Sequence, residues 1–558
     1  MNLSFGLTRR RAWPRGARTV AVLAAAAVLA SVAGAGPAAA GAGASSRPAV
    51  SWRACPYYSD DVLRYLGVPD DGIPAYRAIL NRMECGTVRV PLDYRRPGGR
   101  KITVALTRLR AVDRAHRLGV LALNPGGPGG SGYLIPVKAL TINSVDARLN
   151  QRYDLIGFDP RGVGYSTTFD CPQNSPSPPV GPLTRAQAKA IFDAGAAHNA
   201  SCGHADPAFL RSLTTANIAR DMDRIRAALG ERRLNYLGVS WGTWLGEVYH
   251  TEFAAHVGRM FLDSVVSPYS RIDSDSFNAQ RADAAERDYH RMAAWIAQHN
   301  DTYGFGTTAA QVTAAVIAMR NRYDAHPKTF TDLNRPIDGT LIATAAHNNS
   351  QGWPLAAEAL KELRDPSAGP AAPPAVKQLF GAAPQQAPPP GAPPQSNPTM
   401  GNANRCDEDP SRSGFTRAWH DYQAMLTRDP VTGRANPFNA GCAGWPLPVQ
   451  QYRVHRTPAS VVLSGHLYET NTVYQWTPQA QAAIGGTVFT VRDDVHISVV
   501  QVPACATQAL SYLNTGRIGA GCAGIPVPDS TTPSTTPPAS PTGTRPGNDW
   551  LPPQDQQH

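Results

Sequence analysis

The sequence predicts an α/β fold in which a mostly parallel sheet is flanked by helices and interrupted by a mainly helical insertion. Two observations carry this prediction. Short apolar runs alternate with stretches of helical periodicity between residues 118 and 266, a pattern typical of parallel sheets. The alternation stops over residues 270–453, where helical stretches dominate, and the strand pattern returns after residue 454.

The individual elements follow in chain order. Two paired strands are predicted at the start, from "GTVRVPLDY" and "KITVALTRLRA". Later strands are predicted from near-continuous apolar runs, as expected of strands buried on both faces: 118–124, 153–159, 233–239, 258–266, 458–465 and 485–494. A helix is predicted over 215–229, because apolar residues recur there at helical spacing and Gly230 can end it.

Both ends of the chain are predicted to lie outside the fold. Residues 1–40 resemble an export signal: five arginines precede an apolar run over 19–35, and Ala38–Ala40 offers a cleavage site. A transmembrane anchor is the alternative, but the apolar run is short for a membrane span. Residues 526–558 are rich in Pro, Ser and Thr and are expected to be disordered.

These boundaries divide the chain into segments. The predicted core occupies residues 41–269 and 454–525, and the insertion over 270–453 is expected to form a helical cap that includes a Pro-rich loop. Such a cap would cover the carboxyl edge of the sheet, where open α/β sheets place their sites.

Charge and cysteine content restrict the classes of partner. The formal charge of +11 falls to about +6 once the five arginines of the signal are removed, and the body of the chain has no dense basic block. A nucleic-acid partner is therefore not expected. Eight cysteines, an even number in an exported chain, predict disulfides rather than a metal site, since no C-x-x-C pair occurs. Pairing between neighbours is expected: 55–85, 171–202, 406–442 and 505–522.

The stretch "NYLGVSWGTWLGE" places a candidate nucleophile, Ser240, between a predicted strand and a predicted helix. A G-x-S-x-G sequence at such a junction forces the serine into a strained turn that exposes its hydroxyl. Gly238 and Gly242 flank it because a Cβ at either position would clash as the turn tightens. A glycine-flanked packing turn is the alternative.

A serine nucleophile needs a base, and the base needs an acid to orient it. His496 follows the last predicted strand, where the base is expected, and His466 is its competitor at the end of the preceding strand. Glu469 is the candidate acid, because it lies in the loop after that strand. If Glu469 does not serve, Asp494 or Asp263 would have to, or the site would be a dyad.

The glycine-rich turn in "LALNPGGPGGSGY" is the candidate oxyanion site. Glycines allow a backbone N–H to approach the developing oxyanion. Gly127 is the expected donor, with Gly126 close behind, and Trp241 is expected to supply the second N–H. A phosphate-cradling loop is the alternative, but the lysine that it requires is missing.

Several motifs in order resemble the secreted actinobacterial tripeptidyl aminopeptidase-like α/β-hydrolases, which are relatives of the prolyl iminopeptidases. They are "CGTVRVPLDYRRPGGRKITVALTRLRA", "NPGGPGGSG", "DLIGFDPRGVGYS", "TTANIARDMDRIRAALGERRLNYLGVSWGT", "FLDSVVSP" and "CATQALSYLNTGRIGAGC". The resemblance runs from about residue 55 to 522 and is interrupted in the cap. It implies an α/β-hydrolase fold and an exported serine peptidase that acts on free peptide N-termini.

The resemblance assigns the nucleophile to Ser240 and the base to His496. The family's acid loop reads D-P-x-T-P; Thr472 matches it, so Glu469 occupies the aspartate position, and both prolines are missing. An acidic cap residue could bind the substrate ammonium group, and the candidates are Glu286, Glu358, Glu362, Glu408 and Asp409. We expect peptide substrates, a monomer, no cofactor, no metal and no stable membrane insertion. An esterase and a non-catalytic binding protein are the rival functions.

Overall fold

The computed structural model describes residues 49–171, 179–269, 275–365, 369–381, 387–529. The predicted signal peptide and most of the predicted tail lie outside these residues. Within these ranges, no helix is both long and apolar enough to cross a membrane.

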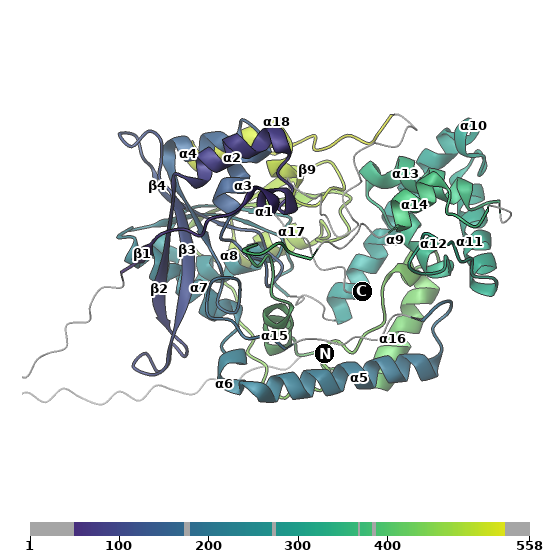
Figure 1. The fold of residues 1–558 in the computed structure, drawn as a ribbon, viewed down its shortest axis with the longest axis horizontal. Helices are drawn as coiled ribbons and strands as arrows, with labels where there is room; N and C mark the ends of the chain where they lie inside the picture. Colours follow the sequence, from purple (N-terminus) through teal and green to yellow (C-terminus); the bar gives the residue numbers. More distant parts are fainter. Residues whose placement is uncertain (1–48, 172–178, 270–274, 366–368, 382–386, 530–558) are drawn as a thin grey trace, which may run out of the picture. The chain divides into compact units, whose positions relative to one another are not determined.

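The described part contains a ten-stranded sheet, in the order β1-β2-β3-β5-β4-β6-β7-β8-β9-β10. Figure 1 shows its strands β2 and β3 side by side. The strands are β1 (Ser51–Arg53), β2 (Met83–Pro91), β3 (Lys101–Leu109), β4 (Gly119–Asn124), β5 (Tyr153–Phe158), β6 (Leu234–Val239), β7 (Val257–Asp263), β8 (Ser460–His466), β9 (Thr487–Val491) and β10 (Gly521–Cys522). Along this order, neighbouring strands are antiparallel from β1 through β2 and β3 to β5. They are parallel from β5 through β4 to β10. The predicted mostly parallel sheet is confirmed.

Helices cover both faces of this sheet, as the alternation along β4 shows. Val120 and Ala122 belong to a core that includes residues of α7 (Thr215–Ala228) and α8 (Trp241–Glu252). Leu121 and Leu123 point to the other face, in a core shared with α3 (Ile135–Ile142) and α18 (Pro503–Thr515). The remaining helices before β7 and after β8 are α1 (Asp60–Tyr65), α2 (Ile73–Leu80), α4 (Leu149–Arg152), α5 (Arg185–Ala205), α6 (Pro207–Leu210) and α17 (Trp476–Ile484).

The predicted helix over 215–229 is confirmed as α7, whereas the 21-residue helix α5 was not predicted. Only a few residues of α5 are buried, among them Phe192 and Cys202. A helix with so narrow an apolar stripe leaves little periodic signal in its sequence.

The long connection between β7 and β8 is helical, as predicted. Its helices are α9 (Asp275–Gln298), α10 (Asn300–Tyr303), α11 (Ala309–Ala325), α12 (Gly339–Ala346), α13 (Trp353–Glu362), α14 (Pro374–Phe380), α15 (Pro398–Glu408) and α16 (Phe415–Arg428). A separate hydrophobic core joins α9, α11, α12 and α13 around buried residues such as Met292, Val316 and Trp353. This segment therefore has a hydrophobic core of its own.

Three of the four predicted disulfides are present: Cys55–Cys85, Cys406–Cys442 and Cys505–Cys522. The prediction of a fourth disulfide is wrong, because Cys171 and Cys202 are free thiols in the structure. Burial, and then the hydrogen bond with Cys171, raise the pKa of Cys202 to about 12, which favours the protonated thiol and disfavours thiolate attack.

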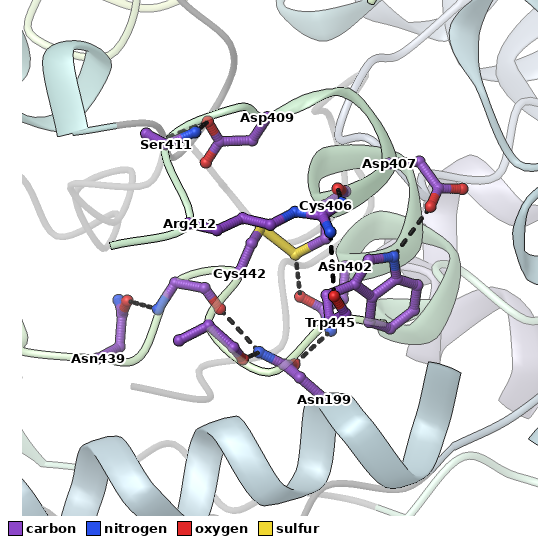
Figure 2. The surroundings of a disulfide bond; sticks show 12 residues. Asn199, Asn402, Cys406, Asp407, Asp409, Ser411, Arg412, Asn439, Cys442 and Trp445 are labelled. Carbon is purple, nitrogen blue, oxygen red and sulfur yellow. Dashed lines mark hydrogen bonds between the residues drawn. A yellow bond between two sulfur atoms is a disulfide. The ribbon is translucent and has the colours of Figure 1, made fainter. Parts of the chain in front are cut away.

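The Cys406–Cys442 bond fixes the carboxyl end of α15 (Figure 2). Around it, Asn199 of α5 donates to the carbonyl oxygens of Gly441 and Ala443, at 2.9 Å each. Arg412 donates to the carbonyl oxygen of Cys406 at 2.7 Å. These contacts tie α5, α15 and the segment after α16 together.

Candidate active site

Ser240 occupies the turn between β6 and α8. Its φ of 56° lies in the left-handed region, and a residue with a Cβ adopts this conformation only under strain. The flanking glycines leave no room for a side chain: a Cβ at Gly238 would lie 2.6 Å from the carbonyl oxygen of Gly242, and a Cβ at Gly242 would lie 2.6 Å from Asn124 Oδ1. The turn is thus the sharp strand-to-helix turn that the G-x-S-x-G sequence predicts.

His496 and Glu469 meet at this edge of the sheet. The loop after β9 carries His496, and its Nδ1 forms a hydrogen bond with Glu469 Oε1 in the loop after β8. The same carboxylate oxygen accepts the backbone N–H of Thr472 at 2.9 Å and its hydroxyl at 2.7 Å. Because the contact uses Nδ1, it leaves Nε2 of His496 for another partner.

Charge and hydrogen bonding decide the ionisation of Glu469. Burial alone would raise the pKa of this carboxyl, but the charge of His496 and the hydrogen bonds from His496 and Thr472 hold its pKa below the usual value. Glu469 is therefore a buried carboxylate that stays ionised next to the imidazole.

The backbone of Asp263 and the side chain of Ser264 join the nucleophile to this pair. Ser240 donates its backbone N–H to the carbonyl oxygen of Asp263 at 3.0 Å. Ser264 Oγ donates to Glu469 Oε2 at 3.1 Å and accepts the N–H of Ile497, the residue after the base, at 2.9 Å. Although Ser240 and His496 both lie in the described part, no hydrogen bond joins Ser240 Oγ to His496. Catalytic hydrogen bonds are often long in free enzymes.

His466 has a different environment from His496. Its Nδ1 lies 2.7 Å from Asp493 Oδ1 and its Nε2 lies 3.0 Å from Asp263 Oδ1, and all three side chains are buried. Burial by itself would lower the pKa of His466, but the two flanking carboxylates raise it well above the usual value. A histidine with both nitrogens engaged by carboxylates is a fixed imidazolium and a poor base. Asp263, an alternative acid, contacts His466 rather than His496.

The other alternative acid, Asp494, is occupied by the segment between β7 and β8. It accepts the hydroxyl of Ser350 at 2.7 Å and the guanidinium of Arg291 at 3.0 Å. Arg291 also lies over the ring of Tyr468, 3.8 Å from its centroid. Helix α9, which carries Arg291, therefore contacts the residue before Glu469 and a residue two positions before His496.

The glycine-rich loop after β4 packs against the Ser240 turn through Gly126. A Cβ at Gly126 would lie 2.9 Å from Ser240 Cβ and 3.1 Å from the backbone nitrogen of Trp241. The N–H of Gly126 is already donated to Asn124 Oδ1 at 3.0 Å. By contrast, the backbone N–H groups of Gly127 and Trp241 have no hydrogen-bond acceptor among the described residues.

The five carboxylates singled out from the sequence of the predicted cap are all engaged by protein groups. Glu286 accepts the hydroxyl of Thr432 at 2.7 Å, and Glu408 accepts the N–H of Thr215 at 2.6 Å. The other three have these partners: Glu358 with Lys361, Glu362 with the N–H of Val376, and Asp409 with Ser411.

A separate group of soft ligands lies outside this site. Cys171, His198 and Cys202 place their ligand atoms within 4.8 Å of one another, and His198 and Cys202 are one turn apart on α5. Thiolate and imidazole are ligands that zinc accepts. A cavity of about 570 Å³ near Tyr57 and Arg77 contains no predicted site residue.

Sequence inspection did not identify Ser264, the role of His466 or the Arg291 contacts. Ser264 did have one recognisable signal, since it is a polar residue directly after a buried strand at the carboxyl edge of the sheet. The His466 and Arg291 contacts join segments more than 25 residues apart, and nothing in the local sequence marks them.

The fold and this serine turn define the class of the protein as an α/β-hydrolase, and the profile of the alpha/beta hydrolase fold family matches residues 119–330. The chain is 32% identical over 469 residues to the tripeptidyl aminopeptidase of Streptomyces lividans, covering 78% of this chain and 82% of that protein. It therefore belongs to the tripeptidyl aminopeptidase family of α/β-hydrolases. Shorter matches are the serine protease Hip1 of Mycobacterium tuberculosis, 35% identical over 36% of this chain and 41% of that protein, and the carboxylesterase B of the same species, 32% identical over 33% and 36%.

Proposed function

We propose that this protein is an exported serine exopeptidase that releases short peptides, foremost tripeptides, from free N-termini. The observation that carries the proposal is the convergence of three segments at Asp263 and Ser264: the Ser240 turn, the acid loop at Glu469 and the base loop at His496. Peptide substrates are supported by the relatives named tripeptidyl aminopeptidase.

The proposed mechanism is acyl transfer in two steps. His496 Nε2 takes the proton of the Ser240 hydroxyl while Oγ attacks the scissile carbonyl carbon. Glu469 holds the imidazole through Nδ1 and stabilises the imidazolium that forms. The tetrahedral intermediate then collapses: the C–N bond breaks, His496 protonates the leaving amine, and an acyl-enzyme remains. Water, deprotonated by His496, hydrolyses the ester and restores Ser240.

Gly127 and Trp241 are the proposed oxyanion donors. Their N–H groups have no acceptor among the described residues, whereas the N–H of Gly126 is used by Asn124. Because α8 begins at Trp241, the positive end of its dipole also faces the negative charge of the intermediate.

We further propose that residues 270–453 act as a cap over the site and that the protein works as an extracellular monomer. The contacts of Arg291 and Ser350 with Asp494 support a cap that braces the base loop. Three disulfides support an oxidising compartment. All proposed site residues come from one chain, so no partner subunit is needed.

The test is a panel of tripeptide anilides with free and N-acetylated termini, together with short acyl esters. An exopeptidase cleaves the free tripeptides, rejects the acetylated ones and loses this activity in Ser240→Ala. Efficient cleavage of acyl esters without cleavage of free peptides would favour an esterase instead. No hydrolysis and no covalent labelling of Ser240 would favour a binding protein.

A further inference from the structure

The side chain of Ser264 is buried at the point where the proposed acid and base loops meet. It directly follows β7 and makes two hydrogen bonds through Oγ, one to Glu469 Oε2 and one from the N–H of Ile497. Glu469 Oε1 is occupied by His496 and Thr472. The two carboxylate oxygens of Glu469 therefore have different hydrogen-bond partners, and Ser264 is the partner of Oε2.

The backbone of Ser264 is strained. Its φ is 57°, and the residues other than glycine with positive φ in the described part are Ser240, Ser264 and Ile497. All three belong to this site. Glycine would adopt the conformation of Ser264 without the steric cost that a Cβ brings. A serine kept in a glycine-like conformation indicates that its hydroxyl has a use, since strain of this kind persists at functional sites.

The length of the acid explains what that use is. A glutamate has one more rotatable bond than an aspartate, so its carboxylate needs more contacts to hold one orientation. We propose that Ser264 is a positioning residue that locks the Glu469 carboxylate and, through Ile497, the loop of His496. This inference rests on the proposed function, because it assigns Ser264 to the proposed Ser240–His496–Glu469 site.

Charged groups from several elements face this pair. Arg281 of α9 donates to Asn471 Oδ1 in the loop of Glu469, at 2.8 Å. Asp263, the residue before Ser264, contacts His466, which also contacts Asp493. His496 contacts the other carboxylate oxygen of Glu469. Asp494, two residues before His496, forms an ion pair with Arg291. Loss of the Ser264 hydroxyl removes one hydrogen bond from the ionised carboxylate of Glu469, so this carboxylate should interact more strongly with the imidazolium form of His496. The acid limb of kcat/KM should shift to higher pH.

Ser264→Gly is the decisive variant, because it removes the hydroxyl and relieves the backbone at once. We expect a fall in kcat of about tenfold to a hundredfold, as for one lost hydrogen bond to a charged group, and little change in KM. Relief of the backbone should offset part of the stability that is lost with the two hydrogen bonds of Ser264 Oγ. A purely structural role would leave kcat and the pH profile at their wild-type values when they are measured below the melting transition. The matched control is Ser464→Ala, which removes from the neighbouring strand β8 a buried hydroxyl that has no hydrogen-bond partner among the described residues.

A double-mutant cycle with Glu469→Asp tests the pairing itself. The shorter acid is expected to give up its contact with Ser264 when it holds His496, so Ser264→Gly should cost less than about twofold in that background. If the glycine variant fails to fold, Ser264→Ala, measured below its melting transition, gives the same comparison of kcat and pH profile.

The outcomes separate this inference from the proposed function. If Ser240→Ala is inactive and Ser264→Gly keeps the wild-type kcat and pH profile, the inference is wrong and the function stands. Equal costs of Ser264→Gly in the wild-type protein and in the Glu469→Asp background would also overturn it. If Ser240→Ala keeps full activity, the proposed function fails.

Discussion

Asp263 Oδ1 lies 3.0 Å from Nε2 of His466, and both side chains are buried. The carbonyl oxygen of the same Asp263 accepts the N–H of Ser240. One residue at the end of β7 therefore links a buried ion pair to the proposed nucleophile. Burial raises the pKa of Glu469, the charge and hydrogen bond of His496 lower it, and the charge of His466 lowers it further.

His466 is expected to stay doubly protonated at pH 8, because carboxylates flank both of its nitrogens. Since its folded pKa is raised, the stability it adds is complete below about pH 6.5 and is lost as the pH rises toward the folded value. Nitrogen-detected NMR of labelled histidine checks the protonation directly. A His466 signal that titrates near pH 6.5 would contradict the ion-pair assignment.

Gly126→Ala should strongly reduce kcat. The added Cβ would lie 2.6 Å from the carbonyl oxygen of Val239 and 2.9 Å from Ser240 Cβ, so the Ser240 turn or the loop must move. A displaced oxyanion donor costs about 10²–10³-fold in kcat. Steady-state kinetics on a free tripeptide anilide gives the measurement.

The control for this variant is Gly391→Ala. Gly391 has a similar φ of 84°, and no atom lies within 4 Å of an added Cβ. Gly391→Ala should lose only the stability that a Cβ costs at a positive φ, and it should keep the wild-type kcat. Similar kinetics for the two variants would show that the contact of Gly126 with the Ser240 turn does not matter.

Glu408→Gln should lower stability rather than substrate affinity. Glu408 is buried and accepts the N–H of Thr215 and the indole N–H of Trp244 at 3.0 Å. Weakening such charged hydrogen bonds costs about 1.5–3 kcal/mol of unfolding free energy. Denaturant unfolding and KM for free tripeptides are to be compared. A raised KM with unchanged stability would instead assign Glu408 to the substrate ammonium group.

Replacing Cys406 and Cys442 by serine should destabilise the protein by about 3–4 kcal/mol, the loop-entropy value for a cross-link of this span. The variant should also lose activity below its melting temperature. The reason is that Asn397, at the start of α15, donates its N–H to the carbonyl oxygen of Gly129 in the proposed oxyanion loop at 2.9 Å. Tm and kcat of the variant are both measured. A wild-type kcat together with a lower Tm would show that the disulfide contributes to stability and not to activity.

The central strands and the Ser240 turn could be predicted from the sequence because their signals are local. Buried parallel strands give apolar runs such as 118–124, and the turn carries its own glycines. Glu469 and His496 followed from chain order, and the structure joins them by a hydrogen bond. Ser264 and the paired role of His466 depend on contacts between distant loops, so no periodicity reveals them. Whether Cys171 and Cys202 form a disulfide likewise depends on their geometry in the fold, which the spacing of cysteines along the chain does not give.

The most direct test of the proposed catalytic site is covalent labelling with a fluorophosphonate probe, followed by peptide mass spectrometry. We predict one labelled serine, Ser240, with labelling strongly slowed in His496→Ala and slowed to a lesser degree in Glu469→Gln. Labelling of another serine, or equal labelling rates in wild type and His496→Ala, would contradict the assignment.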